Sequence, residues 1–223
     1  MTTHLITGAG SGIGSEVARR LLDRGDELVL LARSEERAEE LRAAYEGADV
    51  QVADLAWPES VDALELPSTL ASVVHAAGIV ELGPVAELTV DDWASQLRVN
   101  LVAPAALTRV ALPALRAARG TVVFVNSGAG ITAHPGWSAY AASKHGLRAL
   151  ADSLRGEEPD LRVTTIYPGR TATPMQAKVH QHEGKEYDAS AWTHPETVAD
   201  AILHVLDLPR DATMTDVTLR PGG

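Results

Sequence analysis

Tyr140 and Lys144 stand four residues apart in a segment with the pattern of a helix. Residues at positions i and i+4 share one helix face, so the phenol and the ammonium are directed into the same space. Ser127 follows the apolar run of residues 121–126, where a buried strand is expected to end. A phenol, an ammonium and a hydroxyl in one site could protonate and hydrogen-bond a substrate oxygen, which is the chemistry of carbonyl reduction.

A glycine-rich turn follows the short apolar segment at residues 4–7, in the sequence Thr7-Gly-Ala-Gly-Ser-Gly-Ile-Gly14. Glycines allow a tight turn from a strand into a helix and let backbone N–H groups approach a pyrophosphate. A plain glycine turn is the competing interpretation, but a strand before it and a helix after it favour a nucleotide site. The residues expected to hold a cofactor here are Gly8, Ser11, Gly12, Ile13 and Gly14.

Short apolar segments alternate with longer helical patterns along the chain. The apolar segments are rich in Val, Leu and Ile without clean alternation, which is typical of strands buried on both faces. Strands are predicted at residues 4–7, 27–32, 49–53, 72–76, 121–126, 162–167 and 217–220. Helices are predicted at residues 13–24, 34–45, 90–118, 138–155 and 195–206. This order predicts an α/β fold of the Rossmann type, a doubly wound parallel seven-stranded sheet with helices on both faces.

Helix ends and one short connection can also be predicted. Ser34 is a suitable N-cap for the second helix. Gly25 and Gly120 fall where helix C-caps are expected. Residues 57–70, between the third and fourth strands, leave room for about two turns of helix.

The end of the second strand should meet the adenosine ribose of a dinucleotide. An acidic residue there would favour a free 2′-hydroxyl, but Ala32 and Arg33 stand at this place. The guanidinium of Arg33 could pair with a 2′-phosphate and stack on adenine, which favours NADP(H) over NAD(H). A solvated arginine at a helix start is the competing interpretation, and Ser11 could add a hydroxyl to the same phosphate.

In these motifs the chain resembles the short-chain dehydrogenase/reductase family in its compact single-domain form. The resemblance runs from about residue 3 to about residue 222 and implies one dinucleotide-binding and catalytic domain over residues 1–223. The motifs in family order are the glycine turn, Asp54-Leu55, His75-Ala-Ala-Gly78, Asn100, Ser127, Tyr140 with Lys144, and Pro168-Gly169.

The resemblance implies further cofactor contacts. The residues that would hold the adenine ring or line the cofactor floor are Asp54, Leu55, Ala76, Ala77 and Gly78. Those that would lie against the nicotinamide carboxamide or near the phosphates are Pro168, Gly169, Thr171 and Thr173. This second group would fix the nicotinamide face offered to the substrate, with transfer of the pro-S hydride.

The resemblance also implies the catalytic roles. Tyr140 would give the proton, Ser127 would hydrogen-bond the substrate oxygen, Lys144 would bind the nicotinamide ribose, and Asn100 would hold a water in a proton relay. A free phenol has a pKa of roughly 10, and Lys144 with the positive oxidised nicotinamide is expected to lower it. His75 replaces the first Asn of the family's Asn-Asn-Ala-Gly, which bears on packing more than on catalysis.

Residues 170–192 are polar, contain several helix-breaking positions and are expected to form a lid over the substrate. His180 and His182 with Glu183 raise the alternative of a metal site. Two histidines at this spacing without a third ligand are more often solvated, so no metal is assigned. His134 and Trp137 are expected to form walls of the substrate pocket.

Composition excludes several classes of protein. A net charge of -11 argues against a nucleic-acid or anionic-membrane surface. The absence of cysteine excludes disulfides, thiolate chemistry and cysteine metal sites. The N-terminus lacks the basic and apolar regions of a signal peptide, and no apolar stretch comes near the roughly 18 residues of a membrane span. A cytoplasmic protein without nucleic-acid or membrane partners is expected.

The sequence therefore predicts an NADP(H)-dependent reductase of a ketone or aldehyde, with a small-molecule substrate, reversible as an alcohol dehydrogenase. A non-catalytic NADP-binding regulator is the first alternative, against which the set of Ser127, Tyr140 and Lys144 argues. A sugar-nucleotide epimerase or dehydratase is the second, but such chains usually have a different glycine spacing and a larger C-terminal domain.

A homodimer or homotetramer is also expected. Small residues recur at helical spacing on the helix of residues 138–155, where they would permit a neighbouring helix to approach closely: Ala139, Ala142, Ser143 and Gly146. The resemblance implies the same interface, formed by this helix and the long one before it. Packing of these residues within the subunit is the alternative.

Overall fold

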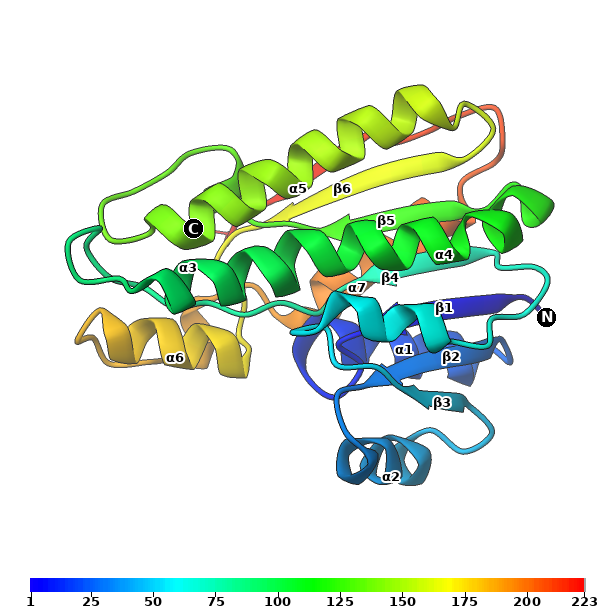
Figure 1. The fold of residues 1–223 in the computed structure, drawn as a ribbon, viewed down its shortest axis with the longest axis horizontal. Coiled ribbons are helices and arrows are strands. Elements are labelled where there is room, and N and C mark those ends of the chain that lie inside the picture. Colours follow the sequence, from blue (N-terminus) through cyan, green and yellow to red (C-terminus); the bar gives the residue numbers. More distant parts are fainter. Residues whose placement is uncertain (223) are drawn as a thin grey trace.

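The computed structural model describes residues 1–222. Its centre is a parallel sheet in the order β3-β2-β1-β4-β5-β6-β7 (Figure 1). The strands are β1 Thr3–Thr7, β2 Glu27–Ala32, β3 Asp49–Val52, β4 Ser72–His75, β5 Thr121–Val125, β6 Arg162–Pro168 and β7 Asp216–Leu219. The seven-stranded, doubly wound α/β fold is confirmed, and each strand ends within one residue of its predicted bounds.

Helices cover both faces of the sheet. They are α1 Gly12–Asp23, α2 Glu35–Ala44, α3 Val90–Leu97, α4 Ala103–Ala118, α5 Ser138–Glu157, α6 Pro174–His182 and α7 Pro195–Asp207. In the view of Figure 1, α4 and α5 lie in front of the sheet, and α1 and α7 lie behind it. Each layer has its own apolar core, which includes Leu21 and Ile202 behind the sheet and Leu107 and Leu147 in front. The strands are buried from both sides because apolar residues occupy both of their faces.

The long helix predicted at residues 90–118 is interrupted. Residues Arg98–Val102 form a π-helical turn between α3 and α4. By length and composition Val90–Ala118 could cross a membrane, with a mean hydropathy of 1.3 in its most apolar window. The expectation that no apolar stretch comes near the length of a membrane span was therefore wrong. Its apolar character has a structural cause, because Leu107, Ala111 and Leu115 are fully buried in the front core.

Helix ends follow the predicted chemistry with one exception. The Ser34 hydroxyl accepts a hydrogen bond from the Arg37 backbone N–H and caps α2. Gly25 has a φ of 84° and follows the last residues of α1, as expected of a C-terminal glycine. At the end of α4 the left-handed residue is Arg119, with a φ of 52°, rather than Gly120. Gly120 is needed for space, because a Cβ there would lie 2.6 Å from the carbonyl oxygen of Leu70.

Two connections contain further helices. Residues Pro58–Ala63 form two turns of 3-10 helix, in agreement with the length of helix for which the sequence leaves room. The region of residues 170–192 contains α6, which the sequence did not predict. Pro174 occupies the first turn of α6, where its missing N–H is not needed, and Thr173 caps the helix by accepting a hydrogen bond from the Gln176 backbone N–H.

Candidate active site

The carboxyl ends of the strands open into a cleft of about 1330 Å³. The strand order reverses between β1 and β4, which is the place where open α/β sheets bind ligands. All the residues predicted for the site line this cleft except two. Gly14 and Asn100 are instead buried beside it.

The glycine turn has the backbone geometry that its sequence predicts. Gly8 and Gly12 have φ angles of 75° and 58°, which L side chains rarely adopt. A Cβ on Gly14 would lie 2.3 Å from the carbonyl oxygen of Gly8, so Gly14 allows α1 to pack closely on the turn. Ser11 precedes α1, and its hydroxyl makes no capping hydrogen bond. The first N–H groups of α1 therefore face the cleft without a side-chain cap.

Thr7 ties the glycine turn to the neighbouring strand end. Its hydroxyl oxygen accepts hydrogen bonds from the backbone N–H groups of Ala76 and Ala77, at 3.1 and 3.0 Å. A Cβ on Gly8 would lie 2.8 Å from the Ala77 nitrogen. These contacts bring the two segments that the sequence assigned to the cofactor together at one edge of the sheet.

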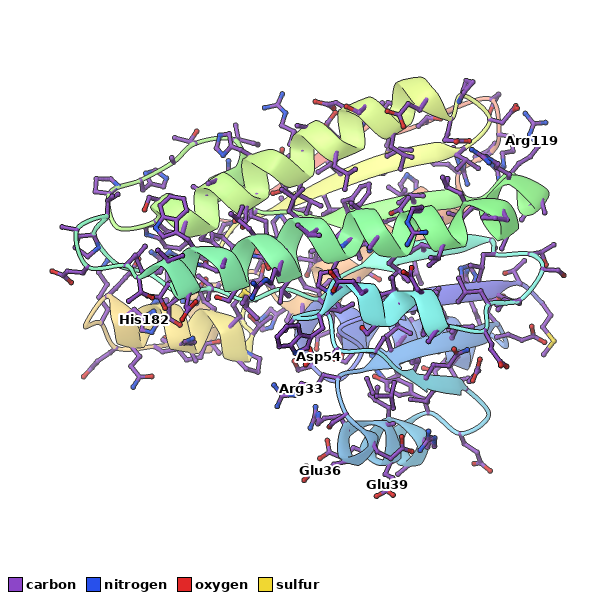
Figure 2. All side chains as sticks on the ribbon, viewed as in Figure 1. Arg33, Glu36, Glu39, Asp54, Arg119 and His182 are labelled. Atoms are coloured by element: carbon purple, nitrogen blue, oxygen red, sulfur yellow. The ribbon has the colours of Figure 1, made fainter. Side chains whose placement is uncertain are left out.

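Two arginines lie at the adenosine end of the cleft. Arg33 is exposed at the end of β2, and Figure 2 shows it beside Asp54 from the neighbouring strand end. The Asp54 carboxylate accepts a hydrogen bond from the Ala56 backbone N–H at 2.9 Å, which shapes its turn. Arg37, which the sequence reading missed, lies over Gly10 and pairs with Glu40. The sequence could have indicated Arg37, because it stands four residues after Arg33 and so near the same strand end.

The cleft fits a nicotinamide dinucleotide. Its backbone turn has uncapped N–H groups for phosphates, its adenosine end carries guanidinium groups, and its walls continue without a break to Tyr140. Thr173 also reaches the phosphate region, because its methyl group lies 3.1 Å from the position of a Cβ on Gly12. The dinucleotide would lie across the point where the strand order reverses, with its nicotinamide end near Gly78 and Gly169.

Tyr140 and Lys144 face the same space from α5, as their spacing predicts. Both are buried, and the Lys144 ammonium lies 5.8 Å from the centre of the Tyr140 ring. Lys144 donates a hydrogen bond from Nζ to the carbonyl oxygen of Val125, 3.0 Å away. Ser127 begins the turn after β5, and the Asn126 side chain fixes this turn to α5 by donating to the Lys144 carbonyl oxygen and accepting from the Ser127 N–H.

Burial sets the proton affinities of this pair. Loss of solvent raises the pKa of Tyr140 to about 12, although a hydrogen bond with Ser127 acts in the other direction. Burial also lowers the pKa of Lys144 to about 8. The expectation that Lys144 lowers the pKa of Tyr140 is therefore not met in the protein alone. The ammonium is itself poorly solvated and is directed to a backbone carbonyl, so desolvation of the phenol dominates.

Asn100 lies in the π-helical turn, and its side chain makes three hydrogen bonds within the protein. Its Oδ1 accepts from the Ile79 backbone N–H, and its Nδ2 donates to the Ile79 carbonyl oxygen and to Ser143 of α5. The amide joins the segment after β4 to α5 close to Gly78. A role in a proton relay stays a prediction.

The two lid histidines do not converge. His180 is buried against Tyr187 and Trp192, with ring centres 5.3 and 5.4 Å away. His182 instead lies 3.3 Å from a carboxylate oxygen of Glu81. Within residues 1–222 no three His, Asp or Glu side chains form a group that could hold a metal ion.

The substrate end of the cleft is lined mainly by apolar residues. Trp137 lies edge-on to Tyr140, with ring centres 5.8 Å apart, and His134 is exposed at the rim. The sequence reading missed the other walls, which are Val80, Met175 and Val179. Met175 and Val179 were missed because residues 170–192 were expected to form a polar lid without a helix, although their spacing of four places them on one face of α6.

Known proteins share both this sequence pattern and this fold. A family model described as short chain dehydrogenase matches residues 2–184. An uncharacterised oxidoreductase of Staphylococcus aureus is 27% identical over 227 residues, covering 97% of this chain and 96% of its own.

Two solved structures have nearly the same fold. An alcohol dehydrogenase from the archaeon Thermococcus sibiricus, complexed with 5-hydroxy-NADP, has a TM-score of 0.85 and 28% identity over 99% of this chain and 97% of its own. A short chain dehydrogenase from Escherichia coli, complexed with NADPH, has a TM-score of 0.86 and 28% identity over 97% and 95%. Because the family model matches most of the length of this chain, the chain belongs to the short-chain dehydrogenase family of oxidoreductases.

Proposed function

We propose that this oxidoreductase uses NADP(H) in preference to NAD(H) to reduce a ketone or an aldehyde to an alcohol, reversibly. The observation that carries the proposal is that Tyr140, Lys144 and Ser127 share one cleft with the glycine turn and Arg33. The NADP-complexed relatives support the cofactor class. Ala32 ends β2 without a carboxylate, which supports the preference for a 2′-phosphate.

The chain's own groups suit the reduction of a carbonyl. When bound, the cofactor supplies the hydride that the carbonyl carbon gains. Tyr140 gives its phenol proton to the carbonyl oxygen. A phenol is protonated at neutral pH, and burial extends this protonated range by raising the pKa of Tyr140 to about 12. Ser127 donates a hydrogen bond to the same oxygen. The Lys144 ammonium, 5.8 Å from the ring, stabilises the phenolate that is left until it regains a proton from solvent.

Other residues position the reactants. We propose that Gly8, Ser11, Gly12 and Ile13 hold the phosphates, that Asp54 and Leu55 hold adenine, and that residues 76–78 form the floor. Pro168, Gly169 and Thr171 would hold the nicotinamide end, and residues 170–192 would cover the substrate. The hydrogen bonds that the Thr7 hydroxyl oxygen accepts from the backbone N–H groups of residues 76 and 77 support this arrangement, because they fix the turn and the floor to each other.

A screen of carbonyl compounds with NADPH and with NADH tests the proposal. Oxidation of NADPH, followed by absorbance, is expected with at least one compound and at a higher kcat/KM than with NADH. A non-catalytic regulator would bind NADPH without consuming it in the presence of any compound, and this result would refute the proposed function.

We also propose that the protein is a homo-oligomer, although the contact surface differs from the stripe of small residues that the sequence suggested. Of the small residues on α5, Ala139 and Ser143 are buried within the subunit and Gly146 is covered by Leu101, so they do not form a free stripe. Val102, 45% exposed at the start of α4, leaves apolar surface beside them. Light scattering should give a mass at least twice the 23.6 kDa of the chain, and a monomer alone would refute this.

A further inference from the structure

Arg220 follows β7 and enters the cleft between two of its functional turns. Its Cα lies 3.6 Å from the position of a Cβ on Gly169, in the turn that we assign to the nicotinamide end. Its Nη1 lies 2.7 Å from the position of a Cβ on Gly128. Gly128 is the residue after Ser127, and neighbouring Cα atoms are about 3.8 Å apart. The guanidinium is therefore next to the turn that carries the proposed hydrogen-bond donor to the substrate oxygen.

The other basic groups of the cleft are remote or already engaged. Arg33 and Arg37 lie at the adenosine end, around the glycine turn and the start of α2. Lys144 donates to a backbone carbonyl. Arg170 forms an ion pair of 2.6 Å with Glu183 and lies 5.3 Å from the centre of the Trp192 ring.

Arg220 lacks a partner, unlike Arg37, Lys144 and Arg170, and it lies away from the adenosine end, unlike Arg33. Within residues 1–222 its exposed guanidinium makes no ion pair or hydrogen bond. Glu183, an acid that lines the same cleft, accepts hydrogen bonds from Arg170 and Lys185. A guanidinium presents paired N–H donors that match a carboxylate.

Part of the cleft wall has a different character. Val80, Met175 and Val179 pack with Tyr140 and Trp137 in an apolar cluster. A substrate bound at this end of the cleft would have both apolar groups and an unpaired cation within the lining of the same cleft. A carbonyl compound with a short carbon chain and one carboxylate matches both.

We propose that Arg220 binds the carboxylate of the substrate, so that the substrate class is a short oxo acid and its hydroxy acid. This inference rests on the proposed carbonyl reduction. In that reaction the oxo acid gains the hydride at carbon and a proton at oxygen, and the carboxylate is unchanged. Arg220 is thus a specificity residue, and its contact lies away from the reacting atoms.

Three pairs of nearly isosteric probes differ in charge, because a methyl group replaces a carboxylate oxygen in each, and comparison of the wild type with Arg220→Gln cancels their difference in carbonyl reactivity. They are pyruvate with 2,3-butanedione, acetoacetate with 2,4-pentanedione, and 4-oxopentanoate with 2,5-hexanedione. In wild-type enzyme with NADPH, kcat/KM for the acid should exceed that for the diketone by roughly 10-fold or more in at least one pair. Arg220→Gln should abolish this preference, and Arg220→Lys should keep part of it. Arg210→Gln, an exposed arginine before β7, is the matched control.

A binding measurement separates this inference from the proposed function. Calorimetric titration of Tyr140→Phe with NADPH present should give tighter binding of the acid than of its diketone, and Arg220→Gln in that background should remove the difference. If no probe is reduced but this difference is found, the proposed function fails and the carboxylate site stands. Equal affinity for acid and diketone in every pair, or no binding of any acid, overturns the carboxylate site. The carboxylate site is also overturned if Arg220→Gln lowers kcat/KM equally for the acid and for its diketone. Unfolding temperatures confirm that the variant is folded.

Discussion

The ammonium of Lys144 lies 5.8 Å from the centre of the Tyr140 ring, and both side chains are buried on the inner face of α5. This pair gives the site two opposite pKa shifts with one cause. Desolvation disfavours the charged form of each group, so it raises the pKa of Tyr140 to about 12 and lowers that of Lys144 to about 8. Before the cofactor binds, the site thus contains a neutral phenol at Tyr140 beside a Lys144 ammonium that loses its proton more easily than an exposed lysine does.

The two directions of the reaction should depend on pH in opposite ways. Reduction requires the protonated phenol, which is the dominant form at neutral pH, so its kcat/KM should be level near pH 7 and fall only in alkaline solution. Oxidation of the alcohol requires the deprotonated phenol and should become faster as pH rises. Steady-state profiles in both directions test this, and a reduction rate that increases from neutral to alkaline pH would contradict the assignment of Tyr140 as the acid.

Ser127→Ala should slow carbonyl reduction by roughly 100-fold, the usual effect of removing one hydrogen-bond donor to a developing oxyanion. It should also leave Tyr140 without the hydrogen bond that opposes the rise in its pKa. Ser127→Thr keeps the hydroxyl and is expected to retain more activity than the alanine variant. Steady-state kinetics at fixed NADPH provide the comparison, and equal rates in the wild type and Ser127→Ala would exclude the role.

Arg33→Ala should weaken binding of NADPH by roughly 10-fold and leave binding of NADH nearly unchanged, because only NADPH has the 2′-phosphate. Solvent exposure of Arg33 keeps this figure modest. Ala32→Asp should go further, since it adds repulsion to the phosphate and an acceptor for the ribose. Arg42→Ala, on the part of α2 away from the cleft, is the control.

The readouts for Arg33 are the KM values for both cofactors and direct titration of each cofactor by fluorescence. Use of NADH as efficiently as NADPH by wild-type enzyme would show that the end of β2 does not select the phosphate. An equal effect of Arg33→Ala on both cofactors would show the same.

His75 should make the fold sensitive to acid. Burial lowers its pKa to about 3, so the folded protein holds it neutral, while the unfolded chain binds a proton near pH 6.5. Acid therefore favours the unfolded state, and at pH 5 the cost is about 2 kcal/mol of unfolding free energy relative to pH 7. His4, with a pKa lowered to about 4, adds to the same trend.

The variant His75→Asn should reduce the slope of unfolding free energy against pH between pH 4 and 6.5. The slope is the quantity to compare, because His75 also stacks on Phe124 at 4.9 Å and hydrogen-bonds Thr108, so the variant changes packing at every pH. His204→Asn on the exposed side of α7 serves as the control. Unchanged slopes in denaturant titrations of His75→Asn would show that this histidine is not the acid-sensitive group.

The sequence predicts those features that depend on local pattern. Apolar runs located the seven strands, and the spacing of Tyr140 and Lys144 located their shared face. Features that depend on contacts across the fold were missed. Arg37 and Arg220 are defined by their closeness to Gly10 and Gly128, far away in sequence. The pKa of Tyr140 depends on burial by other segments, so its direction could not be derived from the neighbouring lysine alone.

The central claim is that Tyr140 is the proton donor of an NADPH-dependent reduction. The most direct measurement compares NADPH oxidation by wild type and by Tyr140→Phe with a carbonyl compound that the wild type reduces, alongside titration of NADPH binding to both. The variant should lose nearly all turnover and keep its affinity for NADPH within a few-fold, because the phenol hydroxyl is removed while the ring and the cofactor turn remain. A Tyr140→Phe enzyme that retains the wild-type kcat would contradict the claim.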